Sequence, residues 1–374
     1  MTPFIAPLLG AAVPMPSPDP LGYPAAPALM QALAYLTLTL HFLAMMFTVG
    51  GAMLILVAYL RGDRSTQRFF VTALPLGFSY LVTFGIPPLL FVQVLYGQLF
   101  YTSSVLVGVF WILVVPLLIA AYGALYWHRF ARDAHPRRWL AVLIALAAML
   151  CIAFIYVNNL TLLQTPEAWL SKYAAHPGGA TLNTAEPTHG PRYAFFMLHT
   201  LIVAGAALVL RGAYLRRWGH EDAGRSSARQ GAIAMLIGLC GASAAAGGVL
   251  AAMPAGVRAF VFGNALPLGL LVAGVIFDVA AAALGAIASR RSGLAAAYGA
   301  AVAVTGALAC LVVLRDQVRG AYLEPYFSLS GVPVHAQWGM LAIFGTSLAA
   351  GLALVIALLW KIAPALAAGR RKTT

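Results

Sequence analysis

The sequence predicts an all-α integral membrane protein with nine transmembrane helices. Hydrophobic residues make up 62% of the 374 residues and charged residues only 9%, whereas soluble chains carry about 25% charged residues. Nine apolar stretches each reach the roughly 20 residues that a helix needs to cross a bilayer, so a lipid bilayer is the first expected partner. The expected spans are residues 31–60, 69–95, 103–127, 139–162, 193–215, 230–252, 258–288, 294–314 and 336–361.

The basic residues fall mainly on one side of the predicted membrane. Of the 23 Lys and Arg residues, 18 lie in alternate connections and the C-terminal tail, and 5 lie in the other connections. The positive-inside rule then places the N-terminus outside and the C-terminus in the cytoplasm, which agrees with an odd number of spans. The net charge of +13 therefore reflects topology, and we expect no nucleic-acid partner.

The first spans follow a segment of different composition. Residues 1–30 are rich in proline and cannot form a continuous helix. They lack the basic start of a signal peptide, so we expect an ordered or semi-ordered external segment. The first span carries His41. The second contains Gly85-Ile86-Pro87-Pro88, which predicts a kink, and the third has no Asp or Glu.

A histidine motif occurs twice. Leu40-His41-Phe42-Leu43 lies in the first span and Leu198-His199-Thr200-Leu201 in the fifth. Each motif is followed by Gly-Ala and then by Tyr-Leu-Arg, which predicts two related four-helix units and one further helix. The predicted division is a Pro-rich segment 1–30, a first unit 31–162, an external loop 163–192, a second unit 193–314, an external loop 315–335, and a ninth, peripheral helix with a basic tail 336–374.

The repeated histidines are the first candidate ligands. An imidazole inside a membrane is costly unless a metal or a hydrogen-bond partner satisfies it, so His41 and His199 are expected to bind one or the other. His335, at the outer interface, is a further candidate metal ligand. The remaining cytoplasmic-side histidines, which we expect to be solvated, are His128, His135 and His220.

Polar residues near the outer ends of the spans have two interpretations each. Gln93, in a run rich in Tyr and Phe, belongs either to an aromatic belt or, with the tyrosines, to the edge of a cofactor site. Asn158 and Asn159, at the end of the fourth span, either cap broken backbone or contact a porphyrin. Arg192 lies two turns before His199 and either snorkels to the interface or meets a heme propionate.

Other charged residues suggest fewer roles. Arg315 and Arg319, one turn apart in the last predicted external loop, could grip an anionic group. Asp278 lies well inside the seventh span, where it could relay protons or pair with an arginine such as Arg290, and we favour the pairing. No C-x-x-C-H, phosphate-loop, nucleophile-elbow or H-E-x-x-H motif occurs, and the three cysteines are expected to be core residues.

The order of these features resembles subunit I of the cytochrome bd-type oxygen reductases. That family has nine transmembrane helices, an external N-terminus and a His-Phe-Leu in its first helix, matched by His41-Phe42-Leu43. Its fourth helix ends in an Asn followed by Gln-x-Pro, comparable to Asn158 or Asn159 with Gln164-Thr165-Pro166. A His-Thr early in its fifth helix is matched by His199-Thr200.

The resemblance covers about residues 31–215 and implies that His41 and His199 are axial ligands of two different hemes. It also implies a bacterial inner membrane with a periplasmic N-terminus. We expect heme b, while heme d remains open without a residue that supports it. The family's third helix supplies glutamates and its seventh a Met ligand, and the corresponding spans here have neither. The family's quinol-binding loop is reduced to residues 253–257, which argues against quinol.

We therefore expect electron transfer near the periplasmic face, with a periplasmic cytochrome c or a membrane redox subunit as partner. Terminal oxygen reduction is the first alternative, and no catalytic residue is assigned. The second alternative is a heme-free membrane anchor or transporter subunit, in which both histidines only form hydrogen bonds.

Overall fold

The computed structural model describes residues 15–131, 135, 137–291 and 293–368. Within these ranges nine helices are long and apolar enough to cross a membrane and no strand forms, so the predicted all-α fold with nine spans is confirmed. The long helices are α1 (Pro27–Leu60), α2 (Arg64–Leu95), α4 (Gly108–Phe130), α5 (Arg138–Leu163), α7 (His189–Arg217), α8 (Glu221–Ala252), α10 (Ala265–Arg290), α11 (Leu294–Leu323) and α12 (Trp338–Ala368). The short helices are α3 (Gly97–Leu106), α6 (Trp169–Ala175) and α9 (Ala255–Gly263), with single 3-10 turns at Pro166–Ala168 and Leu329–Gly331.

The loop predicted at residues 315–335 begins later than expected. α11 continues to Leu323 and includes Arg315 and Arg319, which the sequence predicts to lie in the loop. Their polarity suggested a loop, but Asp316 and Arg319 are buried and form an ion pair one turn apart within the helix, at 3.1 Å between Arg319 Nη1 and Asp316 Oδ1. Because the charges are satisfied inside the bundle, the helix does not need to end before them.

The seventh predicted span, residues 258–288, consists of two helices. Asn264 has an extended backbone, with φ −113° and ψ 134°, and separates α9 from α10. Its side-chain amide donates to the Phe260 carbonyl oxygen at 2.8 Å and so closes the end of α9. Pro267 lies in the first turn of α10, where a backbone N–H would have no helical partner. α10 alone is therefore the seventh long apolar helix.

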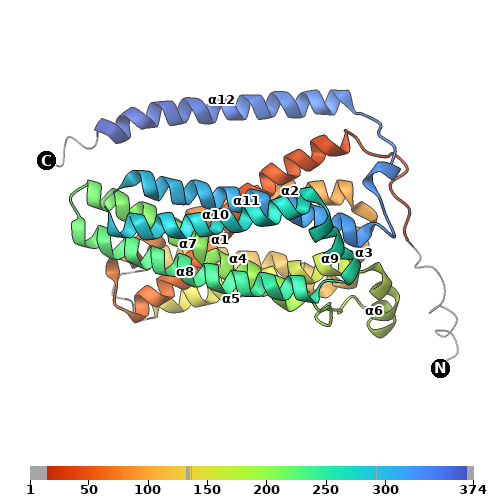
Figure 1. Cartoon of the computed structure of the whole chain (residues 1–374), viewed down its shortest axis with the longest axis horizontal. Coiled ribbons are helices and arrows are strands. Elements are labelled where there is room, and N and C mark those ends of the chain that lie inside the picture. Colours follow the sequence, from red (N-terminus) through yellow and green to blue (C-terminus); the bar gives the residue numbers. More distant parts are fainter. Residues whose placement is uncertain (1–14, 132–134, 136, 292, 369–374) are drawn as a thin grey trace.

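The long helices run side by side in a bundle, with α3, α6 and α9 gathered at one end (Figure 1). α1, α2, α4 and α5 form a closed group in which each helix packs on the next and α5 returns to α1. α7, α8, α10 and α11 form a second closed group in the same way, and α1 packs on α7 between the groups. We call the end with α3, α6, α9 and residues 15–26 and 324–337 the loop-rich end.

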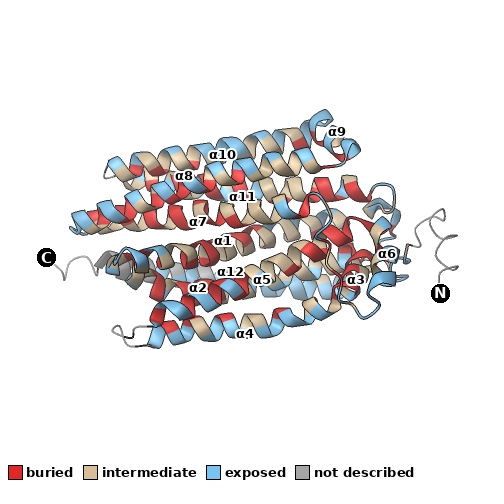
Figure 2. Cartoon of the chain, turned by 90° about the horizontal axis from the view of Figure 1, so that it is seen from below, coloured by how far each residue is buried: buried red, intermediate tan, exposed pale blue. Residues whose placement is uncertain are grey.

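α12 differs from the other long helices because it lies along the outside of the bundle (Figure 1). None of its described side chains is buried, in contrast to α1 and α7, which have the largest buried shares among the long helices. Figure 2 colours each residue by burial and shows buried residues along α2 and α7. An apolar helix with this exposure is suited to contact with lipid.

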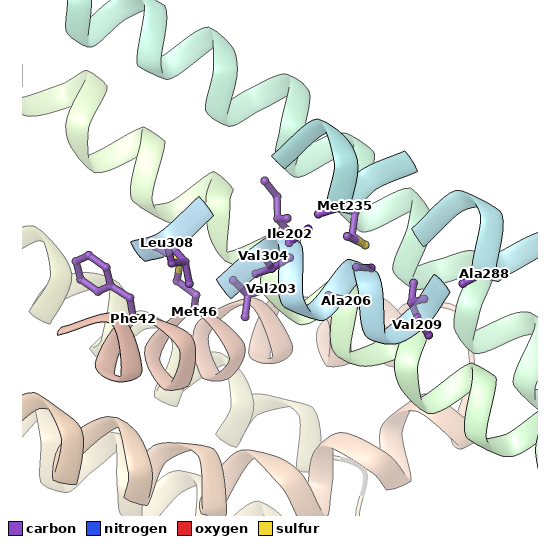
Figure 3. Packing of buried hydrophobic residues seen from close by; sticks show 14 of the residues in the cluster. Phe42, Met46, Ile202, Val203, Ala206, Val209, Met235, Ala288, Val304 and Leu308 are labelled. Carbon is purple, nitrogen blue, oxygen red and sulfur yellow. The ribbon is translucent and has the colours of Figure 1, made fainter. Parts of the chain in front are cut away.

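The two groups meet where α1 crosses α7. A Cβ atom built on Gly50 would lie 2.2 Å from the carbonyl oxygen of Thr200, so the two backbones touch at a point where a larger residue does not fit. Phe42 and Met46 of α1 belong to the same buried cluster as Ile202 of α7 (Figure 3). This close contact fixes how α1 and α7 are rotated, and hence which way their histidines face.

The repeated Gly-Ala dipeptides have equivalent packing roles. A Cβ atom on Gly51 would lie 2.8 Å from the Phe70 ring of α2, and one on Gly205 would lie 2.6 Å from the Gly231 carbonyl oxygen of α8. In each group, the glycine therefore lets the first helix approach the second closely. This equivalence is consistent with the predicted internal repeat.

The proline-rich segment is tied to the loop-rich end over its described part. Tyr23 forms a parallel β-bridge with Val334, and its hydroxyl donates to the Leu95 carbonyl oxygen at 2.8 Å. Burial raises the pKa of Tyr23 to about 12, so the hydroxyl stays protonated as a donor at any physiological pH. Residues 1–14 lie outside the described residues.

The opposite end is held by a half-buried cap at the start of α2. Asp63 accepts hydrogen bonds from the Thr66 backbone N–H at 3.1 Å and from the Thr66 hydroxyl at 2.8 Å. Gln230 of α8 donates to the same carboxylate at 2.6 Å, which links the two helix groups. Burial works to raise the pKa of Asp63, but the hydrogen bonds from Gln230 and Thr66 outweigh it and hold the pKa below its ordinary value.

Asp63→Ala should lower the stability of the protein by about 1 kcal/mol, since it removes a helix N-cap. Because the folded-state pKa is lowered, the stabilisation is present at neutral pH and is lost as the pH falls through that pKa. Thermal unfolding of the protein in detergent against pH measures both effects. Asp19→Ala, at an exposed carboxylate, is the control, and equal acid sensitivity of Asp63→Ala and the wild type would contradict the assignment.

Candidate functional site

His41 faces α2, and a backbone carbonyl of α2 orients its ring. The ring Nδ1 lies 2.9 Å from the Leu81 carbonyl oxygen, and a carbonyl partner requires the proton on Nδ1. No described residue hydrogen-bonds to Nε2, whose lone pair is therefore free. A Cβ atom on Gly85 would lie 2.9 Å from Nδ1, so the glycine makes room for the ring. Gly85, which belongs to the predicted kink signal, therefore also packs against the His41 ring.

His199 faces the opposite way, toward α10. Its side chain is 1% exposed, and its Nε2 lies 3.5 Å from Oδ1 of Asp278. Neither ring nitrogen forms a hydrogen bond of ordinary geometry, and the Asp278 Oδ1 atom is also without one. The expected pairing of Asp278 with an arginine such as Arg290 is wrong, because the basic side chain beside its carboxylate among the described residues is that of His199.

The structure does not bring the two histidines into one site. His41 contacts α2 within the first helix group, whereas His199 contacts α10 within the second. The rings of Phe42 and Phe196, with centroids 5.3 Å apart, pack between α1 and α7. Any ligands of His41 and His199 would therefore occupy separate places on either side of the α1–α7 contact.

Asn158 and Asn159 connect α5 to neighbouring segments at the loop-rich end through hydrogen bonds. The Asn158 side-chain oxygen accepts from the Asn183 backbone N–H at 2.7 Å, and its amide donates to the Phe154 carbonyl oxygen at 2.9 Å. Asn159 accepts from Ser103 of α3 at 2.6 Å. Both side chains are fully buried. These contacts favour the backbone-capping interpretation, and the predicted role of Asn158 at a cofactor stays a prediction.

Arg192 lies in the first turn of α7 and contacts two neighbouring helices. Its Nη1 donates to the side-chain oxygen of Gln164 at 2.5 Å, and its guanidinium lies over the Tyr322 ring, 5.2 Å from the centroid. The second terminal nitrogen, Nη2, is buried without a partner. Two residues that the sequence singled out separately, Gln164 and Arg192, are therefore in direct contact.

Asp316 is the centre of a buried polar network that the sequence did not predict. Its carboxylate accepts hydrogen bonds from Gln31 at 2.9 Å, Tyr35 at 2.6 Å, Tyr96 at 3.2 Å and Arg319 at 3.1 Å. Burial raises the pKa of Tyr96, and Asp316 adds to the rise while Arg319 opposes it, so the Tyr96 hydroxyl stays a donor. The only signal in the sequence was an acid between two arginines at the end of an apolar run.

The other predicted site residues lie apart from this network. Gln93 is half-buried on α2 and forms no hydrogen bond with a described residue. His335 is exposed, and its backbone N–H donates to the Tyr23 carbonyl oxygen at 2.8 Å. The expectation that His128 is solvated is wrong, because it is fully buried and its Nε2 lies 2.8 Å from the Tyr59 hydroxyl.

The fold defines the class of this protein as an all-α, multi-pass membrane protein. No protein-family model matches the chain, and no curated protein matches it either. Among the described residues, no group of three or more His, Cys, Asp or Glu side chains could hold a metal ion. The resemblance to cytochrome bd subunit I thus rests on the sequence motifs and their order.

Asp316→Leu should destabilise the protein by about 3–5 kcal/mol, because it leaves Arg319 buried without its partner. The double variant Asp316→Leu, Arg319→Met should recover much of that loss, since a buried ion pair can be replaced by apolar side chains of similar volume. Thermal or denaturant unfolding in detergent measures both. As a control, Glu221→Ala breaks an exposed ion pair and should cost at most about 1 kcal/mol of stability. If the stability losses of the Asp316 and Arg319 substitutions were strictly additive, the two side chains would not be coupled.

Proposed function

We propose that this protein binds heme b in the membrane and transfers electrons, in the manner of cytochrome bd subunit I. The observation that carries the proposal is His41, whose Nδ1 is held by a backbone carbonyl while Nε2 is free. Metal-ligating histidines in proteins usually donate their other ring N–H in this way. A bound heme would supply the one-electron carrier, and the axial ligand and its surroundings would tune the potential.

His199 is the second proposed ligand of heme iron, on the condition that a neighbouring carboxylate moves. Its ring is fully buried with both nitrogens unsatisfied, which a bound iron would relieve at one nitrogen. However, Nε2 faces the Asp278 carboxylate at 3.5 Å. His199 would bind iron through Nε2 only if Asp278 moved aside. Because the two histidines belong to different helix groups, we propose a separate heme for each.

The proposed setting is a bacterial inner membrane, with the N-terminus in the periplasm. The uneven distribution of Lys and Arg between the two ends of the bundle supports this orientation. The loop-rich end would then face the periplasm, and a cytochrome c or a membrane redox subunit would exchange electrons there. The exposed α12 offers a companion subunit an unpacked surface.

A specific observation also supports the heme-free alternative. Each histidine has a polar neighbour in the protein, namely the Leu81 carbonyl for His41 and the Asp278 carboxylate for His199. In a heme-free membrane anchor or transporter subunit, these partners alone would offset the cost of burying an imidazole. The absorbance spectrum distinguishes the two functions.

The purified protein should show heme b bands in a reduced-minus-oxidised spectrum and in a pyridine hemochrome assay. His41→Ala should remove at least one band, because it removes the iron ligand. Bands that do not respond to carbon monoxide indicate electron transfer, whereas a shift reveals an open iron site and favours oxygen reduction. A protein without any heme band would rule out the proposal and favour the heme-free function.

Gly85→Ala tests the orientation of His41 without removing the ring. The added Cβ would lie 2.9 Å from Nδ1, which is too close, so the ring must turn and the bond to the Leu81 carbonyl weakens. We expect lower heme content or a shifted band in the absorbance spectrum. Gly123→Ala on α4, where a Cβ meets nothing within 4 Å, is the matched control and should leave the spectrum unchanged.

A further inference from the structure

The loop-rich end gathers three arginines, of which Arg319 is buried and Arg192 and Arg315 are partly buried. Arg315 interacts electrostatically with Arg192, Arg319 and Asp316, so three guanidinium groups share one region of the bundle. Asp316 already accepts four hydrogen bonds there. Glu186, which precedes Arg192 along the chain, is a second carboxylate of this region and accepts from the Thr188 hydroxyl at 2.6 Å, so three arginines face two carboxylates. Buried charge without a counter-charge is costly, so this surplus calls for an anion from outside the protein.

Unpaired donors lie in the same place. Arg319 is 4% exposed and its Nε has no partner, and Arg192 Nη2 is likewise unpaired. The Tyr322 hydroxyl is buried near Thr188 and Arg192 but forms no hydrogen bond of ordinary geometry. His189, one turn before Arg192, has a buried and unpaired Nε2. Native proteins rarely leave so many buried polar groups together without partners.

The position of these residues along α7 and α11 indicates where the anion comes from. α11 has 30 residues and is therefore about 45 Å long at 1.5 Å per residue, whereas the hydrocarbon core of a bilayer is about 30 Å thick. Arg319 and Tyr322 lie in its last turns, and Arg192 lies in the first turn of α7. These side chains are thus at the depth of the lipid headgroups, where phosphate is abundant.

We propose that Arg192, Arg315, Arg319 and Tyr322 form a binding site for a phosphate group, supplied by a phospholipid headgroup or by free phosphate. Guanidinium groups bind phosphate oxygens through paired, charge-assisted hydrogen bonds. The phosphate neutralises the surplus charge and accepts from the unpaired nitrogens and hydroxyl. The site uses neither proposed iron ligand, His41 or His199, although Arg192 is also the residue expected to meet a heme propionate.

The test uses the full-length protein reconstituted in nanodiscs of phosphatidylcholine and phosphatidylglycerol. After transfer to detergent, native mass spectrometry measures retained phospholipid, and calorimetry measures binding of inorganic phosphate to delipidated protein. Arg315→Gln and Tyr322→Phe remove donors but keep every hydrogen bond to Asp316, so both variants should fold. Each lost donor should weaken binding about tenfold or more. Arg258→Gln, an exposed arginine at the same end, is the matched control.

The outcomes separate the sources and can overturn the proposal. Retained phospholipid that falls in the two variants but not in Arg258→Gln supports a headgroup site, and phosphate binding alone with the same dependence supports free phosphate. The proposal is overturned if neither binds, or if Arg258→Gln weakens binding equally. It is also overturned if the variants change a heme band but not phosphate binding, since the arginines would then serve the cofactor. Repeating the assay in the double variant His41→Ala, His199→Ala keeps the result independent of both proposed hemes.

Discussion

The close contact of α1 and α7 at Gly50 is the constraint on which the rest of the structure depends. Because the Thr200 carbonyl occupies the place that a Cβ would need, the two helices have one rotation relative to each other. That rotation buries the Phe42 and Phe196 rings between them. It also turns His41 toward α2 and His199 toward α10. The separation of the two histidines is thus a consequence of backbone packing.

Polar groups are used differently at the ends and in the middle of the bundle. At the ends, Asp63 and Asp316 each accept several hydrogen bonds and connect helices that are distant in sequence. In the middle, His199 and Asp278 have only each other. Because unsatisfied polar groups are most costly away from water, this central pair is less well stabilised than the networks at the ends. The contrast supports the proposed role of His199 as a ligand.

Hydropathy predicted the nine helices, since crossing a bilayer imposes a length and a composition that are local in sequence. It could not predict that α11 continues past Arg315, because the partners that satisfy Asp316 come from residues such as Gln31 and Tyr96, far away in the chain. The burial of His128 against Tyr59 was missed for the same reason. The sequence singled out His41, but only the fold shows that Leu81 and Gly85 orient it.

The two helices that carry the histidine motif are similar in packing and differ in chemistry. Gly51 and Gly205 have the same role in their helix groups, yet His41 faces a neutral carbonyl while His199 faces a carboxylate. Under the heme proposal, a carboxylate that stays near His199 after it has moved aside from Nε2 would stabilise ferric over ferrous iron and would lower the potential of that site relative to the other. Two hemes held by one repeated scaffold would therefore differ in potential without any difference in their histidine ligands. Such a difference would give electrons a preferred direction between the two sites.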